Sequence, residues 1–240
     1  MGVSGLMIPS TNFFYSGVDR SELFALAELH RGNRLDVTLD GETNYPTGSK
    51  DDVLAWQAAN GETGITSATP SEFAGKIFVD ATASGALIPL PPRWHIALWN
   101  SRAWQGPAGL GIFAVANRSE WRNPLPHNSH GISSFDFSIP LAITSAIALD
   151  NHIREYKEQQ IKLVALNAKI RHFLLTEIGD VDIAGTLDST LPHLLSFSLL
   201  YVDAALLVNE LDARGLPLIL VRLVVRQIWN LVMYLLRWGC

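Results

Sequence analysis

The sequence predicts a protein of the α/β class, with a larger sheet-forming part followed by a smaller second part. Strand-like and helix-like segments alternate along most of the chain, which is typical of α/β domains. Three apolar runs, at 76–79, 95–99 and 112–115, carry polar residues mainly at their C-terminal ends. This pattern indicates strands of a sheet that is buried on both faces. Two long helical segments after residue 138 separate the two parts.

The composition indicates a globular protein. The chain has 240 residues, enough for one large domain or two small ones, of which 48% are hydrophobic and 17% charged. A net charge of −5 argues against nucleic acid as the main partner. Since Cys240 is the one cysteine, no disulfide can form within the chain, and a reducing, cytoplasmic setting is expected. The first residues lack the pattern of a signal peptide.

In the first half of the chain, the pattern predicts one helix and several short strands. The helix is expected over 19–30, with Asp19 as its N-cap and Gly32 just past its end. Besides the three apolar runs, strands are expected at 6–8, 34–39 and 53–57.

In the second half, helices dominate at first and strands return later. A buried helix is expected over 139–152, opened by Pro140, and a long amphipathic helix over 155–177. Strands at 181–184 and 194–200 precede a helix that Asp203 caps and Gly215 ends. The expected divisions are a partial large domain, connecting helices, a small C-terminal domain and an apolar basic tail, at 1–134, 135–178, 179–215 and 216–240.

Polar residues follow two of the predicted central strands. Asp80 ends the run that starts at Lys76, and Asn100, Ser101 and Arg102 follow the next run. In doubly wound sheets the functional site lies at the carboxyl ends of the strands. These residues are therefore candidates for a binding site.

Two motifs of this region resemble a known family. One is Asp80-Ala81 followed about twenty residues later by a strand and a Gly-Pro-x-Gly-x-Gly turn at 106–111; the other is Asn-Gly-Glu-Thr-Gly at 60–64. Together they resemble the cofactor half of the class V aminotransferases, and most of all the cysteine desulfurases. The resemblance implies a pyridoxal-phosphate-dependent transferase fold, a homodimer, and transfer of sulfur from L-cysteine to an acceptor protein.

The resemblance also implies roles for particular residues. Asp80 matches the acid that pairs with the pyridine nitrogen, and Asn60 matches an asparagine near the cofactor ring. Arg102, which could hold a phosphate with two hydrogen bonds, and Asn100 complete the candidate cofactor-binding residues. Without the motifs, Asp80 reads as an acid at a strand end, Asn60 as a turn residue and Arg102 as a surface arginine.

The sequence departs from the family at the catalytic positions. Ala103 stands where the family has the lysine that binds the cofactor covalently, and Ala83 stands where it has a glutamine. No lysine lies between Lys76 and Lys157, and the family's phosphate-binding loop is absent. The similarity covers about residues 5–215, so the family pattern is incomplete at both ends and no catalytic residue is assigned. The alternatives are an impaired desulfurase and a non-catalytic remnant or interaction protein.

The segment 216–240 differs from the rest of the chain, because it is strongly apolar and has three arginines and no acid. A shifted reading frame can give a string similar to the Ser-Gly-Ser-Ala-Cys loop of the family, so a frameshift is our hypothesis and Cys240 is not taken as the nucleophile. Arg222 and Arg226 argue against a membrane-spanning helix. A basic helix lying at a membrane surface is the remaining alternative.

Other functional classes find little support in the sequence. His127 and His130, with Asp136 nearby, lie in a polar loop without further ligands at a metal-binding spacing, so no metal is expected. No Gly-x-Ser-x-Gly motif indicates a hydrolase, and the turn at 106–111 lacks the Gly-Lys-Ser/Thr of a phosphate-binding Walker loop.

Overall fold

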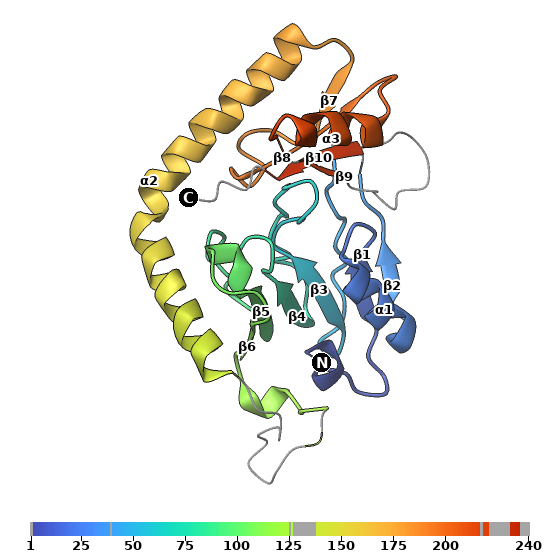
Figure 1. The fold of residues 1–240 in the computed structure, drawn as a ribbon. Coiled ribbons are helices and arrows are strands. Elements are labelled where there is room, and N and C mark those ends of the chain that lie inside the picture. The colour runs from blue at the N-terminus through green and yellow to red at the C-terminus, as the bar shows by residue number, and fades with distance from the viewer. Residues whose placement is uncertain are drawn as a thin grey trace. The chain divides into compact units, whose positions relative to one another are not determined.

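The computed structural model describes residues 2–38, 40–124, 126, 138–216, 218–220 and 231–235 (Figure 1). Contacts divide the chain into two compact units. Unit 1 comprises 1–38, 42–58 and 67–154, and unit 2 comprises 39–41, 59–66 and 155–240. Two short pieces of the first half of the sequence, 39–41 and 59–66, therefore belong to the unit formed mainly by the second half.

Unit 1 is built on a mixed, mostly parallel sheet, which confirms the predicted α/β class. Its strands are β1 (Phe13–Ser16), β2 (Asn33–Leu35), β3 (Val53–Gln57), β4 (Lys76–Asp80), β5 (Ile96–Asn100) and β6 (Gly111–Val115). They lie in the order β2-β1-β3-β4-β5-β6, and every neighbouring pair is parallel except β5 and β6. The first five strands therefore end at one edge of the sheet.

The central strands are buried on both faces, as the apolar runs predict. In β4, Ile77 and Val79 join one core cluster, whereas Phe78 joins the other. In β3, Leu54 and Trp56 likewise alternate with their neighbours between the two clusters. Since successive side chains of a strand point to opposite faces, both faces of the sheet are covered.

The prediction of a strand at 6–8 was wrong, and β1 was not predicted. A short 3-10 helix, η1 (Val3–Gly5), lies at the start of the chain instead. Leu6 is buried in the same cluster as Phe13 of β1, so its apolar character reflects packing and not a strand. The four residues of β1 are too few to show a strand pattern of their own.

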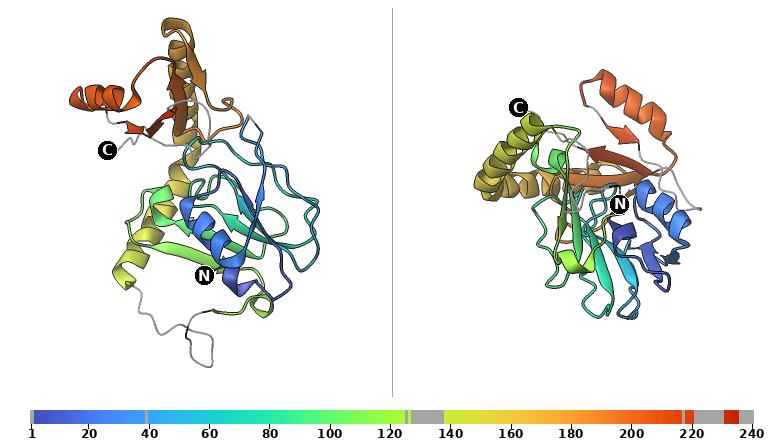
Figure 2. Two further views of the ribbon diagram at one scale, coloured as in Figure 1. Left: turned by 90° about the vertical axis from the view of Figure 1, so that its right-hand side faces the viewer. Right: turned by 90° about the horizontal axis from the view of Figure 1, so that it is seen from below.

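Helix α1 (Ser21–His30) lies against one face of the sheet (Figure 2). Phe24 contacts Tyr15 of β1 edge to face, with ring centroids 5.7 Å apart. The predicted cap was wrong, because Arg20 is the N-cap and makes no side-chain capping bond. Asp19 instead accepts a hydrogen bond from the backbone N–H of Ser16, at 2.6 Å.

Helix α2 (Ile139–Glu177) is one continuous helix, where two were predicted. Between Pro140 and the end of the helix the sequence has no glycine or proline, so nothing stops the helix in the middle. Its first part was also predicted to be buried, but Ile139, Ile143 and Ile147 are 55–62% exposed. The apolar composition of this part therefore does not reflect burial within the described residues.

Unit 2 holds a second sheet, with strands β7 (Val181–Ile183), β8 (Leu194–Leu199), β9 (Ile219–Leu220) and β10 (Leu231–Leu235). They lie in the antiparallel order β7-β8-β10-β9. Helix α3 (Ala204–Ala213) begins as predicted, because Asp203 accepts hydrogen bonds from the N–H groups of Ala205 and Leu206. The hydrophobic core of unit 2 contains Leu174, Leu195, Phe197 and Ala204.

Two stretches of the apolar tail form strands in the structure. They are β9 and β10, and β10 pairs along β8. A helix over these two stretches, the alternative left open by the sequence, is therefore wrong. Arg222, Arg226, Arg237 and Cys240 lie outside the described residues. Among the helices that the structure describes, none is long and apolar enough to cross a membrane.

Candidate functional site

Asp80 ends β4 at the carboxyl edge of the sheet in unit 1, where the sequence places the site. The residue is 3% exposed. Its Oδ1 accepts hydrogen bonds from the backbone N–H of Thr82, at 2.9 Å, and from the Thr82 hydroxyl, at 2.6 Å. Its Oδ2 makes no hydrogen bond to any of the residues described. One carboxylate oxygen is thus fixed by the turn, and the other is an acceptor that no described residue uses.

Arg20 reaches the same turn from the start of α1. Its Nη1 donates a hydrogen bond to the Thr82 hydroxyl, and its Nη2 contacts Glu22 at 3.0 Å. Arg20, Thr82 and Asp80 therefore form a chain of hydrogen bonds that joins α1 to the end of β4. The sequence analysis missed Arg20 and Thr82, because the two residues lie 62 positions apart and no local pattern links them.

Asp19 is a second buried carboxyl group at this edge, 5% exposed. Its Oδ1 is buried and has no hydrogen-bond partner among the described residues. Burial raises the pKa of Asp19 to about 7; the hydrogen bond from Ser16 opposes this shift and the charge of Asp80 adds to it. Asp19, which the sequence predicts as a helix cap, is instead a buried carboxyl group, and burial and the charge of Asp80 disfavour its ionised form.

Asn100 and Arg102 flank the end of β5. The Asn100 Oδ1 accepts a hydrogen bond from the Arg102 N–H, at 3.0 Å, and so caps the short 3-10 helix η2 (Ser101–Trp104). The side chain of Arg102 is exposed. Asn100 thus has a local structural role, while the Arg102 guanidinium is open to solvent.

Ala103, in η2, lies beside the turn that follows Asp80. A Cβ added to Gly85 would lie 3.0 Å from the Cβ of Ala103. Gly85 closes that turn, because its N–H donates to Ala81 at 2.8 Å, and its φ of +56° favours glycine. The position that matches the family's lysine is therefore next to the candidate site.

The lysines of unit 1 lie elsewhere. Lys50 precedes β3, and Lys76 is the first residue of β4. Both are thus near the amino ends of their strands, and the Lys76 Nζ donates to the carbonyl of Leu6, at 3.3 Å. Unit 1 contains no other lysine, so no lysine amine lies at the carboxyl ends of its described strands.

Helix α2 anchors η2 through a buried polar contact. The Ser145 Oγ accepts hydrogen bonds from the Ser101 hydroxyl, at 2.9 Å, and from the Trp104 indole N–H, at 3.2 Å. All three residues are buried. The segment that carries Ala103 is therefore fixed to the helix, and it has little freedom to move independently.

Asn60 belongs to unit 2. Its Oδ1 accepts hydrogen bonds from the N–H groups of Glu62 and Thr63, at 2.8 and 2.9 Å. This is the geometry of a turn asparagine, the local alternative in the sequence analysis. The segment then joins the loop at 189–191, where the Leu191 N–H donates to the carbonyl of Gly64 and Ile65 bridges Thr190.

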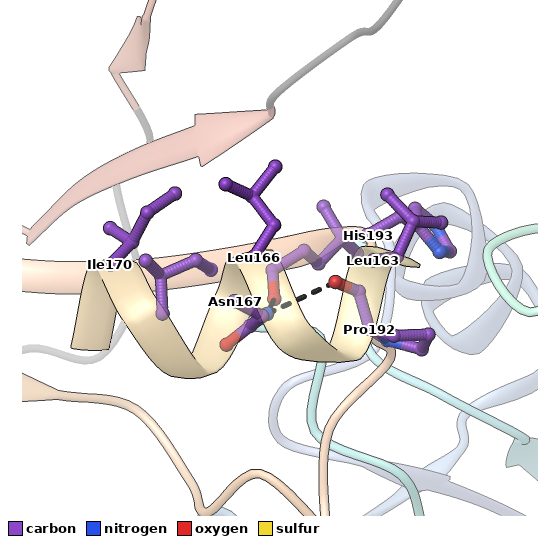
Figure 3. A pocket seen from close by; sticks show the side chains of 8 residues that line it. Leu163, Leu166, Asn167, Ile170, Pro192 and His193 are labelled. Atoms are coloured by element: carbon purple, nitrogen blue, oxygen red, sulfur yellow. Dashed lines mark hydrogen bonds between the residues drawn. The ribbon is translucent and has the colours of Figure 1, made fainter. Parts of the chain in front are cut away.

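A shallow apolar hollow in unit 2 holds no comparable chemistry (Figure 3). Its one amide side chain, Asn167, donates to the carbonyls of Pro192 and Leu194 and accepts from Arg171. These bonds hold α2 against β8, so Asn167 has a structural role. The lining residues are Leu163, Leu166, Asn167, Ile170, Pro192, His193, Leu194 and Leu195.

The described part of the chain shows no cluster of three or more histidine, cysteine, aspartate or glutamate residues that could hold a metal ion. His127, His130 and Asp136, the loop residues considered for metal binding, lie outside the described ranges.

The fold matches solved structures, whereas no family model and no curated protein matches the sequence. A NifS-like protein has a TM-score of 0.82 and 18% identity, over 98% of this chain and 73% of its own. The cysteine desulfurase of Thermococcus onnurineus NA1 has a TM-score of 0.76 and 12% identity, over 96% and 70%.

A third match is a mutant of C-DES that has a lysine-to-alanine change and a glycine covalently linked to its PLP cofactor. Its TM-score is 0.72 and its identity 13%, over 94% of this chain and 69% of its own. At these identities the matches show the fold. This chain covers about seven tenths of the length of each of these proteins.

Proposed function

We propose that this chain, which has the class V aminotransferase fold of the cysteine desulfurases, binds a pyridoxal-phosphate-type cofactor at Asp80 without a covalent bond to lysine. The observation that supports this most is the Asp80 carboxylate, with Oδ1 held by Thr82 and Oδ2 left for a partner. A buried carboxylate suits a protonated ring nitrogen, which is a hydrogen-bond donor. When bound, such a cofactor supplies an electron sink.

The residues present fit the ring of the cofactor but not its covalent attachment. Ala103 has no amine, and the lysines of unit 1 lie near the opposite ends of the strands. A lysine amine would have two tasks, attachment of the cofactor and proton transfer, and this site lacks both. We therefore do not expect the chain alone to transfer sulfur from L-cysteine.

The remaining residues have distinct roles in this proposal. Asp80 pairs with the ring nitrogen, and Thr82 orients the Asp80 carboxylate. The exposed guanidinium of Arg102 offers two parallel donors for a phosphate group. Asn100 fixes the backbone of Arg102. Asn60 has no role in cofactor binding in this proposal, because its side-chain Oδ1 accepts hydrogen bonds within its own turn.

The C-DES structure supports the non-covalent form of the proposal. A protein of this fold that lacks one lysine holds a cofactor that is joined to glycine. A chain without an attachment lysine would bind a cofactor that already carries its amine. Pyridoxamine 5′-phosphate, which has both the ring nitrogen and an amine, is therefore the appropriate probe.

Native mass spectrometry tests the absence of a covalent bond. The protein is mixed with pyridoxal 5′-phosphate, treated with borohydride and compared under native and denaturing conditions. We expect one cofactor per chain in the native spectrum and none after denaturation. A stoichiometric adduct that survives denaturation would show attachment to a lysine, and absence of the cofactor from both spectra would contradict binding.

An interaction role is the second candidate, and the exposed face of α2 favours it. Ile139, Ile143 and Ile147 are spaced four residues apart, so they lie on one side of the helix. An apolar stripe of this kind is typical of a surface that another chain covers. We propose a second copy of this chain as the partner; a sulfur-acceptor protein is the alternative, which measurement of the oligomeric state would distinguish.

A further inference from the structure

We propose that Arg20 is a positioning residue for the ligand-binding carboxylate, because it directs the Thr82 hydroxyl proton onto Asp80 and so leaves the Asp80 Oδ2 for the ligand. This inference rests on the proposed function, since it concerns the same site. It assigns a role to a residue that no sequence motif indicates.

The direction of the hydrogen bonds follows from the chemistry of the three side chains. A guanidinium can only donate, so the Thr82 oxygen must accept from the Arg20 Nη1. A threonine hydroxyl has one proton, and the Asp80 Oδ1 lies 2.6 Å from that oxygen. While Arg20 is in place, the proton therefore points to Asp80. Without Arg20, the hydroxyl would be free to rotate away.

Two donors on one oxygen then fix the rotation of the carboxylate. The Thr82 N–H donates to the same Oδ1 as the hydroxyl, at 2.9 Å. Bonds to one oxygen from the backbone and from the side chain hold the carboxylate plane, and Oδ2 keeps a constant direction. Such preorganisation favours binding, because the carboxylate does not have to be ordered when the ligand arrives.

Arg20 itself is held on both sides. Its Nη2 contacts Glu22 at 3.0 Å, and the residue forms the N-cap of α1. Leu23 and Ala27 bury the inner face of this helix against the sheet. The guanidinium therefore comes from a fixed element, and its charge lies close to the turn that follows the buried Asp80.

Arg93 provides a matched control on the opposite edge of the sheet. Its Nη1 donates to the carbonyl of Ala74 at 3.0 Å, and both residues precede their strands, β5 and β4. Replacement of Arg93 by Gln removes the same charge and one hydrogen bond from the same unit. It leaves the carboxyl edge untouched.

The test is calorimetric titration of pyridoxamine 5′-phosphate into the full chain and five variants. Arg20→Gln and Thr82→Val should each weaken binding about tenfold, the scale of one hydrogen bond to a charged group. The double variant should bind no more weakly than either single variant, because both remove the same chain of bonds. Thr82→Ser, which keeps the hydroxyl, and Arg93→Gln should bind like the wild type.

A second ligand separates positioning from a general structural effect. The ring-carbon analogue of pyridoxamine 5′-phosphate has C–H in place of the ring nitrogen and cannot donate to Asp80. Arg20→Gln should therefore weaken binding of the pyridine ligand and leave binding of the analogue unchanged. Equal losses for the two ligands, additive losses in the double variant, or no loss in Arg20→Gln would each overturn the inference.

Asp80→Asn shows whether the inference or the proposed function has failed. If this variant weakens binding of the pyridine ligand and Arg20→Gln does not, only the role of Arg20 is wrong. If the wild type does not bind, or Asp80→Asn binds as tightly as the wild type, both proposals are wrong. Thermal unfolding of each variant establishes that it is folded.

Discussion

At the scale of single residues, Asp52 and Asp19 are both buried aspartates of unit 1, but their carboxyl groups accept different numbers of hydrogen bonds. Asp52 accepts bonds from the backbone and side chain of Asn12 and from the N–H of Ser49. Burial alone would raise its pKa, but these bonds outweigh burial and lower it. Asp19 accepts one such bond, its Oδ1 has no partner among the residues that the structure describes, and its pKa is raised to about 7.

This difference predicts opposite dependences of stability on pH. The folded-state pKa of Asp19 lies above the ordinary value of 3.8, so the folded protein binds more protons between these values and loses stability as pH rises through them. The loss is complete above about pH 7 and amounts to about 4 kcal/mol. Asp19→Asn should remove it, so urea unfolding should show a variant more stable than wild type at about pH 8 and similar to it near pH 4.

Asp52→Asn is the matched comparison, and we expect it to lower the stability of the protein at neutral pH instead of raising it. Its carboxylate is stabilised in the folded state, so the contribution is present above the ordinary pKa and is lost in acid. At neutral pH the variant should lose about 1–3 kcal/mol, because a buried hydrogen-bonding group is left without its partner. Identical pH profiles for the two variants would contradict this account of both carboxyl groups.

Ala103 provides a prediction of gained chemistry. Ala103→Lys would place an amine beside the turn that follows Asp80. We expect pyridoxal 5′-phosphate to become covalently attached after borohydride reduction, which intact-mass measurement detects as one added cofactor per chain. Lys76→Arg in the same background should leave the adduct in place, because Lys76 lies at the other end of β4. Absence of the adduct in folded Ala103→Lys would show that position 103 does not face the cofactor.

At the scale of elements, the accuracy of sequence prediction depended on local signals. Strands β3, β4 and β5 were predicted because they are continuous apolar runs, and α3 because Asp203 caps it. Strand β1 was missed because it is short, and α2 was divided where its composition changes although nothing breaks the helix. Asp80 was placed correctly at the carboxyl end of β4, whereas Arg20 and Thr82 required the tertiary contact between α1 and the turn.

The contact between α2 and η2 gives a prediction about stability. Ser145→Ala should destabilise the protein by about 1–3 kcal/mol, because two buried donors, on Ser101 and Trp104, lose their acceptor. Thr144→Ala is the control, since Thr144 is exposed and, among the described residues, its hydroxyl donates to carbonyls of its own helix. Urea unfolding that gives equal stabilities for the two variants would contradict an anchoring role for Ser145.

At the scale of the whole molecule, unit 1 exposes apolar side chains on several elements, among them β6 and α2. Strand β6 is an edge strand of its sheet, and Ile112 and Phe113 on it are 37% and 38% exposed. The isoleucines at the start of α2 are more exposed still. Unpaired strand edges and apolar stripes favour association, so we expect poor solubility of the isolated chain.

Self-association should depend on the apolar face of α2. Replacement of both Ile143 and Ile147 by Glu should lower the mass measured by sedimentation equilibrium toward that of a monomer, because a charge cannot be buried without a partner. Ile161→Glu is a control at an isoleucine that is 71% exposed further along the same helix. If the wild-type protein is a monomer, the proposal that a second copy of the chain covers this face is wrong.

Titration of pyridoxamine 5′-phosphate into wild-type protein and Asp80→Asn tests the central claim most directly. The account predicts one site per chain in the wild type and binding about 10–100-fold weaker in the variant, the scale of a hydrogen bond between charged groups. Asp212→Asn, which removes the same charge from the exposed surface of α3, should bind as tightly as the wild type. Absence of binding to folded wild-type protein, or equal affinities for the wild type and Asp80→Asn, would contradict a cofactor site at the carboxyl end of β4.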